Sequence, residues 1–159
     1  MDPQPIDPYT AAAFWALFLG IWIVTFAFIF IVFAALYVVT ALALSRLFAK
    51  VGVEPWIAWV PIYSTWKWLE LGGFPGWVAI LSVIPYANIV TSVFLWIGMY
   101  RTGLAFRKGG EWVVLGIFLP FVWAFLLARP TETYEPQLIT QAGYPPPLVG
   151  HGSAFGPRA

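Results

Sequence analysis

The chain has 159 residues and a net charge of +1, and 61% of its residues are hydrophobic whereas only 9% are charged. A soluble globular domain is about half apolar and about a quarter charged, because its surface must face water. These proportions exclude a cytosolic enzyme, a disordered regulator and a nucleic-acid-binding protein, and they predict an integral membrane protein.

The first predicted element is a long transmembrane helix over residues 11–45, behind a short N-terminus over 1–10 that lies outside the membrane. Residues 11–44 carry no charge, and Thr10 is suited to cap their helix. These 34 residues would form a helix about 51 Å long, whereas the hydrocarbon core of a bilayer is about 30 Å thick. We therefore expect part of the helix to lie in an interface or against another protein. The preceding residues are acidic, which argues against a cleavable signal peptide.

A compact membrane domain is predicted over residues 46–128. Its apolar segments are a short or re-entrant helix over 55–71, a helix over 74–100 that is kinked at Pro85, and a helix over 112–128. The predicted fold class is therefore an all-α integral membrane protein of about four transmembrane or re-entrant helices. Few polar residues accompany the prolines in these segments, so the prolines indicate packing shape rather than a transport site.

Basic residues predict how the chain crosses the membrane. Arg46 and Lys50 follow the first helix, and Arg101, Arg107 and Lys108 follow the third segment. Basic residues in short loops favour the cytoplasm, so an even number of crossings should separate the two clusters. The resulting prediction is four crossings with both termini outside a bacterial plasma membrane. The alternative of three crossings would put the second cluster outside, against the rule.

Aromatic residues make up 19% of the chain, and ten of them are tryptophans. Trp56, Trp59, Tyr63 and Trp66 are spaced three, four and three residues apart, which would place them on one helical face. Such a stripe can bind a lipid, a quinone or a carotenoid pigment, or it can form an interfacial belt that also packs helices. We favour the belt, so no cofactor is predicted and a bound lipid, quinone or carotenoid stays an alternative.

Several short motifs carry a resemblance to a known family. In chain order they are Phe48-Ala49-Lys50-Val51-Gly52, Pro61-Ile62-Tyr63, Ile84-Pro85 with Asn88, Phe106-Arg107-Lys108-Gly109 and Leu119-Pro120. The pattern resembles that of a family of small bacterial membrane domains of unknown function, some of whose members are described as signal-peptidase-like. The resemblance covers about residues 46–128, and it implies a bacterial membrane protein but no particular reaction. Ser64 stands where the family usually has asparagine, and Arg107 where it has glycine.

Catalytic chemistry has one weak candidate. Ser64 and Lys67 match the Ser-x-x-Lys pattern, and residues three apart share a helical face. Lys67 is explained more simply by an ion pair with Glu70, so no catalytic residue is predicted. The chain has no cysteine and a single histidine, His151, so no metal site is predicted either.

Asn88 is the most polar residue expected within the membrane. With Ser92 it lies beside the break at Pro85, and the two are four residues apart on a predicted helix. We interpret this polar face as hydrogen bonds between helices. The alternative is the substrate site of a small transporter.

The C-terminal tail over residues 129–159 has six prolines and four glycines. It includes Tyr144, Pro145, Pro146 and Pro147, a run that favours extended polyproline structure. Because the tail lacks an apolar periodicity for a core of its own, we expect it to lie outside the membrane as a strap along a partner protein.

These observations together predict a non-enzymatic accessory or assembly subunit of a larger bacterial membrane complex, of the energy-transducing or secretion type. The expected partners are other integral membrane subunits and membrane lipids, without nucleic acid. A small transporter or a lipid-, quinone- or pigment-binding module is the second hypothesis, and a serine–lysine membrane hydrolase is the third.

Overall fold

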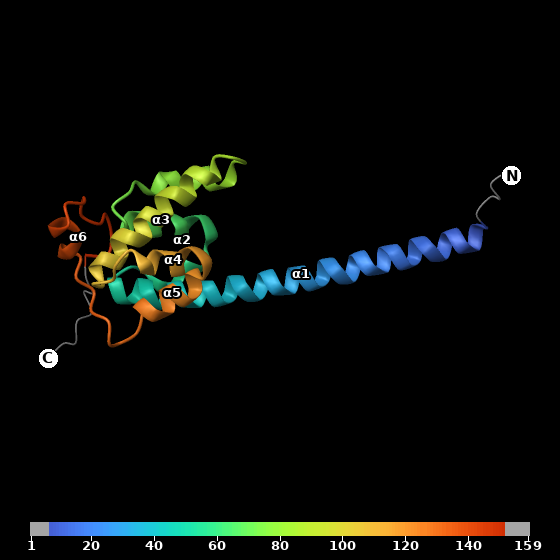
Figure 1. Ribbon diagram of the computed structural model, residues 1–159, viewed down its shortest axis with the longest axis horizontal. Coiled ribbons are helices and arrows are strands. Elements are labelled where there is room, and N and C mark those ends of the chain that lie inside the picture. Colours follow the sequence, from blue (N-terminus) through green and yellow to red (C-terminus); the bar gives the residue numbers. More distant parts are fainter. Residues whose placement is uncertain (1–6, 152–159) are drawn as a thin grey trace. The chain divides into compact units, whose positions relative to one another are not determined.

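The computed structural model describes residues 7–151, and this part of the chain is helical and without strands, as predicted (Figure 1). The helices are α1 (Pro8–Val51), η1 (Pro55–Trp59), α2 (Pro61–Leu71), η2 (Gly76–Val83), α3 (Asn88–Ala105), α4 (Glu111–Phe118), α5 (Pro120–Leu127) and α6 (Gln137–Gln141), of which η1 and η2 are 3-10 helices. The chain divides into two units, residues 1–38 and 39–159, which are described separately.

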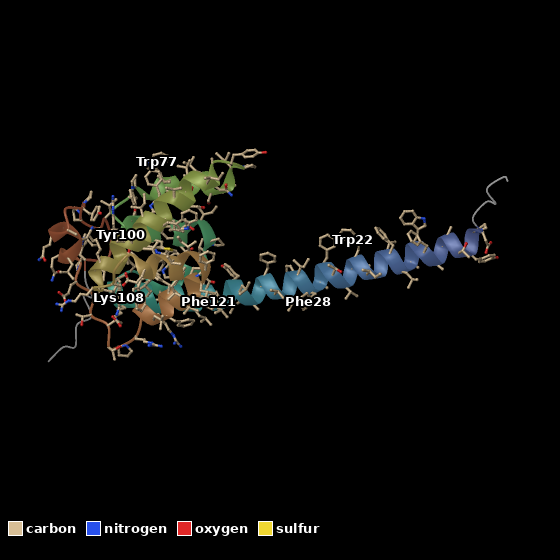
Figure 2. The ribbon with its side chains drawn as sticks, viewed as in Figure 1. Trp22, Phe28, Trp77, Tyr100, Lys108 and Phe121 are labelled. Carbon is tan, nitrogen blue, oxygen red and sulfur yellow. The ribbon has the colours of Figure 1, made fainter. Side chains whose placement is uncertain are left out.

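Unit 1 consists, in its described part, of the N-terminal turns of α1. The helix begins at Pro8 rather than after Thr10, because proline suits the first turn, where no N–H donor is needed. The Thr10 hydroxyl donates to the Asp7 carbonyl oxygen at 2.7 Å. Aromatic side chains then follow at intervals of four residues. Trp22, labelled in Figure 2, meets Phe18 edge to face at 5.9 Å between ring centroids and stacks on Phe26 at 5.3 Å.

The surface of α1 is the clearest sign of its environment. Its most apolar stretch of 18 residues has a mean hydropathy of 2.8, and none of that stretch is buried. Within the described residues, α1 is the one helix long and apolar enough to cross a membrane.

Unit 2 is built from the last turns of α1, residues 39–51, and three helical hairpins. In the first hairpin η1 packs against α2, and the Ser45 hydroxyl of α1 donates to the Pro55 carbonyl oxygen at the start of η1 at 2.9 Å. Because α2 runs back, its end at Leu71 returns to the end of α1. Gly150 of the tail lies against both ends: a Cβ atom added to it would be 2.5 Å from the Leu71 side chain and 3.2 Å from the Val51 carbonyl oxygen.

The second hairpin pairs η2 with α3. Phe74 and Phe94 meet edge to face at 4.9 Å, and the buried Thr91 hydroxyl donates to the Val78 carbonyl oxygen at 2.9 Å. These contacts place η2 and α3 side by side, and the turn that joins them lies at residues 84–87 (Figure 1). The single kinked helix expected over 74–100 is therefore a 3-10 helix and an α-helix that run in opposite directions.

The third hairpin pairs α4 with α5, in place of the single helix expected over 112–128. It reverses at Leu119, whose backbone leaves the helical region at φ −135° and ψ 66°. Proline explains the reversal, since it has no N–H and disfavours helical geometry in the preceding residue. Pro120 opens α5, and Pro61 opens α2 in the same way after the extended Val60.

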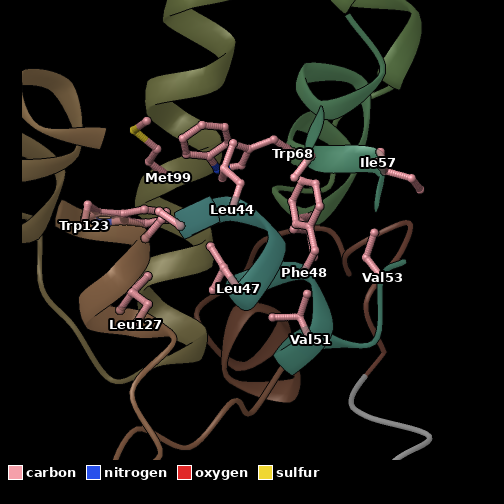
Figure 3. Close-up of a cluster of buried hydrophobic side chains, with 14 of the residues drawn as sticks. Leu44, Leu47, Phe48, Val51, Val53, Ile57, Trp68, Met99, Trp123 and Leu127 are labelled. Carbon is pink, nitrogen blue, oxygen red and sulfur yellow. The ribbon is translucent and has the colours of Figure 1, made fainter. Parts of the chain in front are cut away.

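The hydrophobic core of unit 2 forms where the hairpins surround the end of α1. Leu47 and Phe48 of α1 are fully buried, and they belong to the same cluster as Trp68, Met99 and Trp123 (Figure 3). The Trp68 and Trp123 rings stack at 5.8 Å between centroids. Each of the three hairpins thus contributes to one core.

The described part of the C-terminal tail packs on the rest of unit 2, whereas the sequence predicted a strap along a partner protein. Ile139 of α6 is fully buried. The backbone N–H of Glu135 donates to the Ala105 carbonyl oxygen, and that of Leu148 to the Glu70 carbonyl oxygen, both at 2.8 Å. Apolar periodicity does not reveal such a segment, because scattered buried residues, backbone hydrogen bonds and ion pairs hold it. Residues 152–159, which the same prediction covers, lie outside the described residues.

Candidate functional site

The charged residues of unit 2 gather at one end, where the hairpins begin and finish. We call this the polar end. It comprises the last two turns of α1, α2 and α3, the loops beside them, the start of α4 and the tail. Its charged residues are Arg46, Lys50, Glu54, Lys67, Glu70, Arg101, Arg107, Lys108, Glu111, Arg129, Glu132 and Glu135.

Three ion pairs neutralise most of the acidic groups at the polar end. Lys67 pairs with Glu70 at 2.7 Å within α2. The other two pairs join the loop after α3 to the tail: Arg107 binds Glu135 at 2.8 Å, and Lys108 binds Glu132 at 2.9 Å. The tail is therefore held by charge as well as by Ile139.

Lys50 caps the end of α5 from the neighbouring helix. Its Nζ donates to the carbonyl oxygen of Leu127 at 3.0 Å and also to that of Arg129, and it lies 5.5 Å from the centre of the Phe106 ring. The last carbonyl groups of a helix lack partners within the helix and carry partial negative charge. Lys50 satisfies them and thereby fastens α5 to α1.

Arg101 joins α3 to the end of α2 and to the tail. It donates to the Gly72 carbonyl oxygen at 3.0 Å. Its guanidinium lies 4.1 Å from the centre of the Phe74 ring and 5.0 Å from that of Tyr144, close enough for cation–π attraction to both. The predicted tail residue Tyr144 thus contacts the chain itself.

The turns of the hairpins form the opposite, apolar face of unit 2. We call these the apolar tips. At the tip of η2 and α3, Tyr86 is 87% exposed, and at the tip of α4 and α5, Phe118 is 77% exposed. The further exposed apolar residues of the tips are Val60, Ile62, Val83, Ile84, Ile89 and Leu119. No charged residue occurs in any of the tips.

The four aromatic residues predicted to share one helical face lie on two elements. Trp56 and Trp59 belong to η1, whereas Tyr63 and Trp66 belong to α2, because the chain turns at Val60. The rings of Trp56 and Tyr63 still approach to 5.9 Å. The indole N–H of Trp66 donates to Glu70 at 2.7 Å, and that of Trp56 donates to Glu54 at 2.6 Å. Trp56 and Trp66 therefore lie beside carboxylates of the polar end.

Ser64 and Lys67 do not bind each other among the described contacts. The Ser64 hydroxyl donates to the Pro61 carbonyl oxygen at 2.8 Å, while the Lys67 amine pairs with Glu70. Each group is engaged by another partner. A nucleophile requires a base within hydrogen-bond reach, so this geometry offers no support for the hydrolase hypothesis.

Asn88 lies at an apolar tip, where it is exposed at the start of α3. Ser92 donates to the Asn88 backbone carbonyl oxygen at 3.0 Å, within the same helix. The hydrogen bond that joins two helices comes instead from Thr91 of α3, whose hydroxyl donates to the Val78 carbonyl oxygen of η2. The residues around Pro85 are thus a turn and not a polar cleft between helices.

The predicted proline run of the tail is only partly exposed. Pro145 and Pro146 are exposed, whereas Pro147 is buried. Nearby, the Tyr134 hydroxyl donates to the Gly150 carbonyl oxygen at 2.7 Å, and burial raises the pKa of this phenol, which keeps it a neutral donor.

No cluster of three metal-ligating side chains occurs in the described part of the chain. His151 is exposed at its end.

Comparison with known sequences shows that most of unit 2 matches a protein family. Residues 56–136 match a family described as one of unknown function, DUF5684, and so cover about half of the chain. This agrees with the predicted membership of a family of unknown function. Neither the curated proteins nor the solved structures include a match to the chain.

Proposed function

The chain belongs to this family of unknown function, and we propose that it is a membrane-embedded, non-enzymatic accessory or assembly subunit of a larger bacterial membrane complex. An energy-transducing or a secretion complex is the expected host. The bacterial plasma membrane is the location that the sequence resemblance implies.

The observation that carries this proposal is the exposed apolar surface of α1. Burial of apolar surface is favourable by about 25 cal/mol per Å², so an unburied helix of this kind requires lipid or protein around it. Its uncharged run is about 51 Å long, about 20 Å more than the hydrocarbon core of a bilayer. Tilting does not easily absorb that excess, which leaves α1 with surface for a partner subunit.

The hairpins of unit 2 are suited to enter a membrane without crossing it. Helices α4 and α5 have 8 residues each, about 12 Å, which is less than half of the hydrocarbon thickness. Unpaired backbone groups are costly in lipid, and backbone hydrogen bonds close two of the tips. At the second tip the Asn88 N–H donates to Ile84, and at the third tip the Leu119 N–H donates to Leu115.

The proposed topology follows from where the hairpins end. Each hairpin leaves the polar end and returns to it, so the three hairpins add no net crossing and α1 adds one. Basic residues favour the cytoplasmic side, which places the polar end and the tail inside the cell and the N-terminus outside. This topology replaces four crossings with both termini outside, and it keeps both basic clusters on one side.

Cysteine labelling tests the topology, because the chain has no cysteine of its own. Single variants Tyr9→Cys, Tyr86→Cys and Thr140→Cys report on the N-terminus, an apolar tip and the tail. In intact cells a membrane-impermeant maleimide should modify only Tyr9→Cys. Thr140→Cys should react in inverted vesicles, and Tyr86→Cys only in detergent. Modification of Thr140→Cys in intact cells would contradict the topology.

Purification from the native membrane tests the role as a subunit. In a mild detergent the protein should be recovered with a stoichiometric membrane-protein partner, and harsher detergent should separate the two. A single monodisperse species of 17.8 kDa without a partner would contradict the role.

A further inference from the structure

We infer that the ends of α1 and α5 form a binding site for the phosphate of an anionic lipid headgroup, with Arg46 and Arg129 as its ligands. We call Arg46, Lys50, Phe125 and Arg129 the phosphate site. The inference rests on the membrane embedding proposed above, and it adds a ligand at a defined place.

The contacts of Lys50 and Phe125 bring the two arginines to one patch. Arg46 and Lys50 are one helical turn apart on α1. Phe125 lies in the last turn of α5, and Arg129 follows two residues after the helix ends at Leu127. Lys50 donates to the backbone carbonyl oxygen of Arg129. The Arg46 guanidinium carbon lies 5.3 Å from the centre of the Phe125 ring, which supports its side chain.

The two arginines are exposed cations without an acidic partner. Among the described residues, no carboxylate lies within 4.0 Å of Arg46 or Arg129. Glu132 is the acidic group that acts electrostatically on Lys50, and its own carboxylate pairs with Lys108 at 2.9 Å. Within the described residues, the two arginine guanidinium groups are therefore not neutralised by an ion pair.

Lys50 also reduces the electrostatic repulsion that an anion would otherwise meet at the end of α5. The end of a helix carries partial negative charge, which would repel a phosphate. Because Lys50 donates to the carbonyl oxygens of Leu127 and Arg129, that charge is offset. The two guanidinium groups remain available for a ligand outside the protein.

The surroundings of the site match the depth of a lipid headgroup. One turn before Arg46, Leu42 of α1 is 44% exposed, and Phe118 and Leu119 are exposed at the tip of the α4–α5 hairpin. The arginines therefore stand where an apolar surface meets the polar end. Guanidinium groups bind phosphate oxygens in a bidentate way, and basic pockets between helices on the cytoplasmic side hold anionic headgroups.

Lipid retention in native mass spectrometry tests the site with the full-length protein. The protein in mild detergent is mixed separately with phosphatidylglycerol, phosphatidylcholine and inorganic phosphate. The unmodified chain should retain phosphatidylglycerol in preference to the other two. The double variant Arg46→Gln/Arg129→Gln should lose at least about tenfold in affinity, because it loses both charge-assisted ligands.

Arg107→Gln is the matched control, since it removes one exposed arginine of the polar end that pairs with Glu135. It should retain phosphatidylglycerol as the unmodified chain does. Equal retention by the double variant and the control would overturn the site while the cysteine-labelling topology still stands. Retention of inorganic phosphate without lipid, or equal retention of the two lipids, would overturn the assignment to an anionic lipid.

Discussion

Arg107 adopts a backbone conformation that favours glycine, with φ at 59°. In this region the Cβ atom of an L-residue crowds the following carbonyl oxygen, at a cost of about 1 kcal/mol. The ion pair with Glu135 offsets little of that energetic cost, because 72% of the Arg107 side chain is exposed and exposed ion pairs are weak. The sequence resemblance has glycine at this position, and the turn after α3 supplies a physical reason for it.

The turn leads to a prediction for two variants of Arg107. Arg107→Gly should have a free energy of unfolding about 1 kcal/mol higher than that of Arg107→Ala. Both variants lose the ion pair, and only glycine accepts the positive φ without strain. Thermal unfolding of the two in the same detergent measures the difference. Equal stabilities would show that the turn is not strained.

Lys50 is the other single residue with a clear energetic role. Lys50→Met keeps most of the side-chain length but leaves the carbonyl oxygens of Leu127 and Arg129 without their donor. A hydrogen bond that involves a charged group contributes about 1.5–3 kcal/mol, so the free energy of unfolding should fall by about that amount. Arg107→Met removes only an exposed ion pair and should cost less than about 1 kcal/mol. If both variants lose the same stability, Lys50 does not act as a cap.

At the scale of elements, the crossing of α2 and α3 depends on one glycine. A Cβ atom on Gly72 would overlap the backbone of Gly98, whereas one on Gly98 would lie 3.7 Å from the Gly72 Cα, an ordinary contact. Gly72→Ala should therefore lower the free energy of unfolding by about 1–3 kcal/mol, because backbone atoms must move apart.

Gly98→Ala is the matched variant at the same crossing. It should be tolerated, since alanine also favours the helical backbone of α3. Chemical or thermal unfolding of both variants measures the asymmetry. A larger loss for Gly98→Ala than for Gly72→Ala would mean that the two helices cross differently.

The hairpins show why the helical segments could be predicted, whereas the direction in which the chain continues after each proline could not. The apolar runs and their prolines are visible along the chain, and they locate the helical segments. A proline can kink a helix or start a new one that runs back, and periodicity does not distinguish the two. The reversal at Leu119 brings Trp123 onto Trp68 at 5.8 Å, a contact between residues far apart in sequence.

At the scale of the whole molecule, the segregation of charge in unit 2 predicts different tolerances at its two ends. In lipid vesicles Phe118→Lys should lower stability by about 2–3 kcal/mol, because it places a charge at an apolar tip. Thr140→Lys, on the exposed face of α6, should have almost no effect. Thermal unfolding in vesicles compares the two. Equal effects would place the tips in water.

The helical class, the long apolar helix and the membership of a family of unknown function could all be predicted along the chain, because composition, apolar runs and short motifs are local properties. The folding back of the apolar segments and the packing of the tail on its own unit became visible in the folded chain alone. The tertiary structure also decided which residues make the polar end. Lys50 binds the Leu127 carbonyl oxygen across 77 residues of chain, and Arg101 binds that of Gly72 across 29. Such partners depend on how the helices pack, and no pattern of neighbouring residues encodes them.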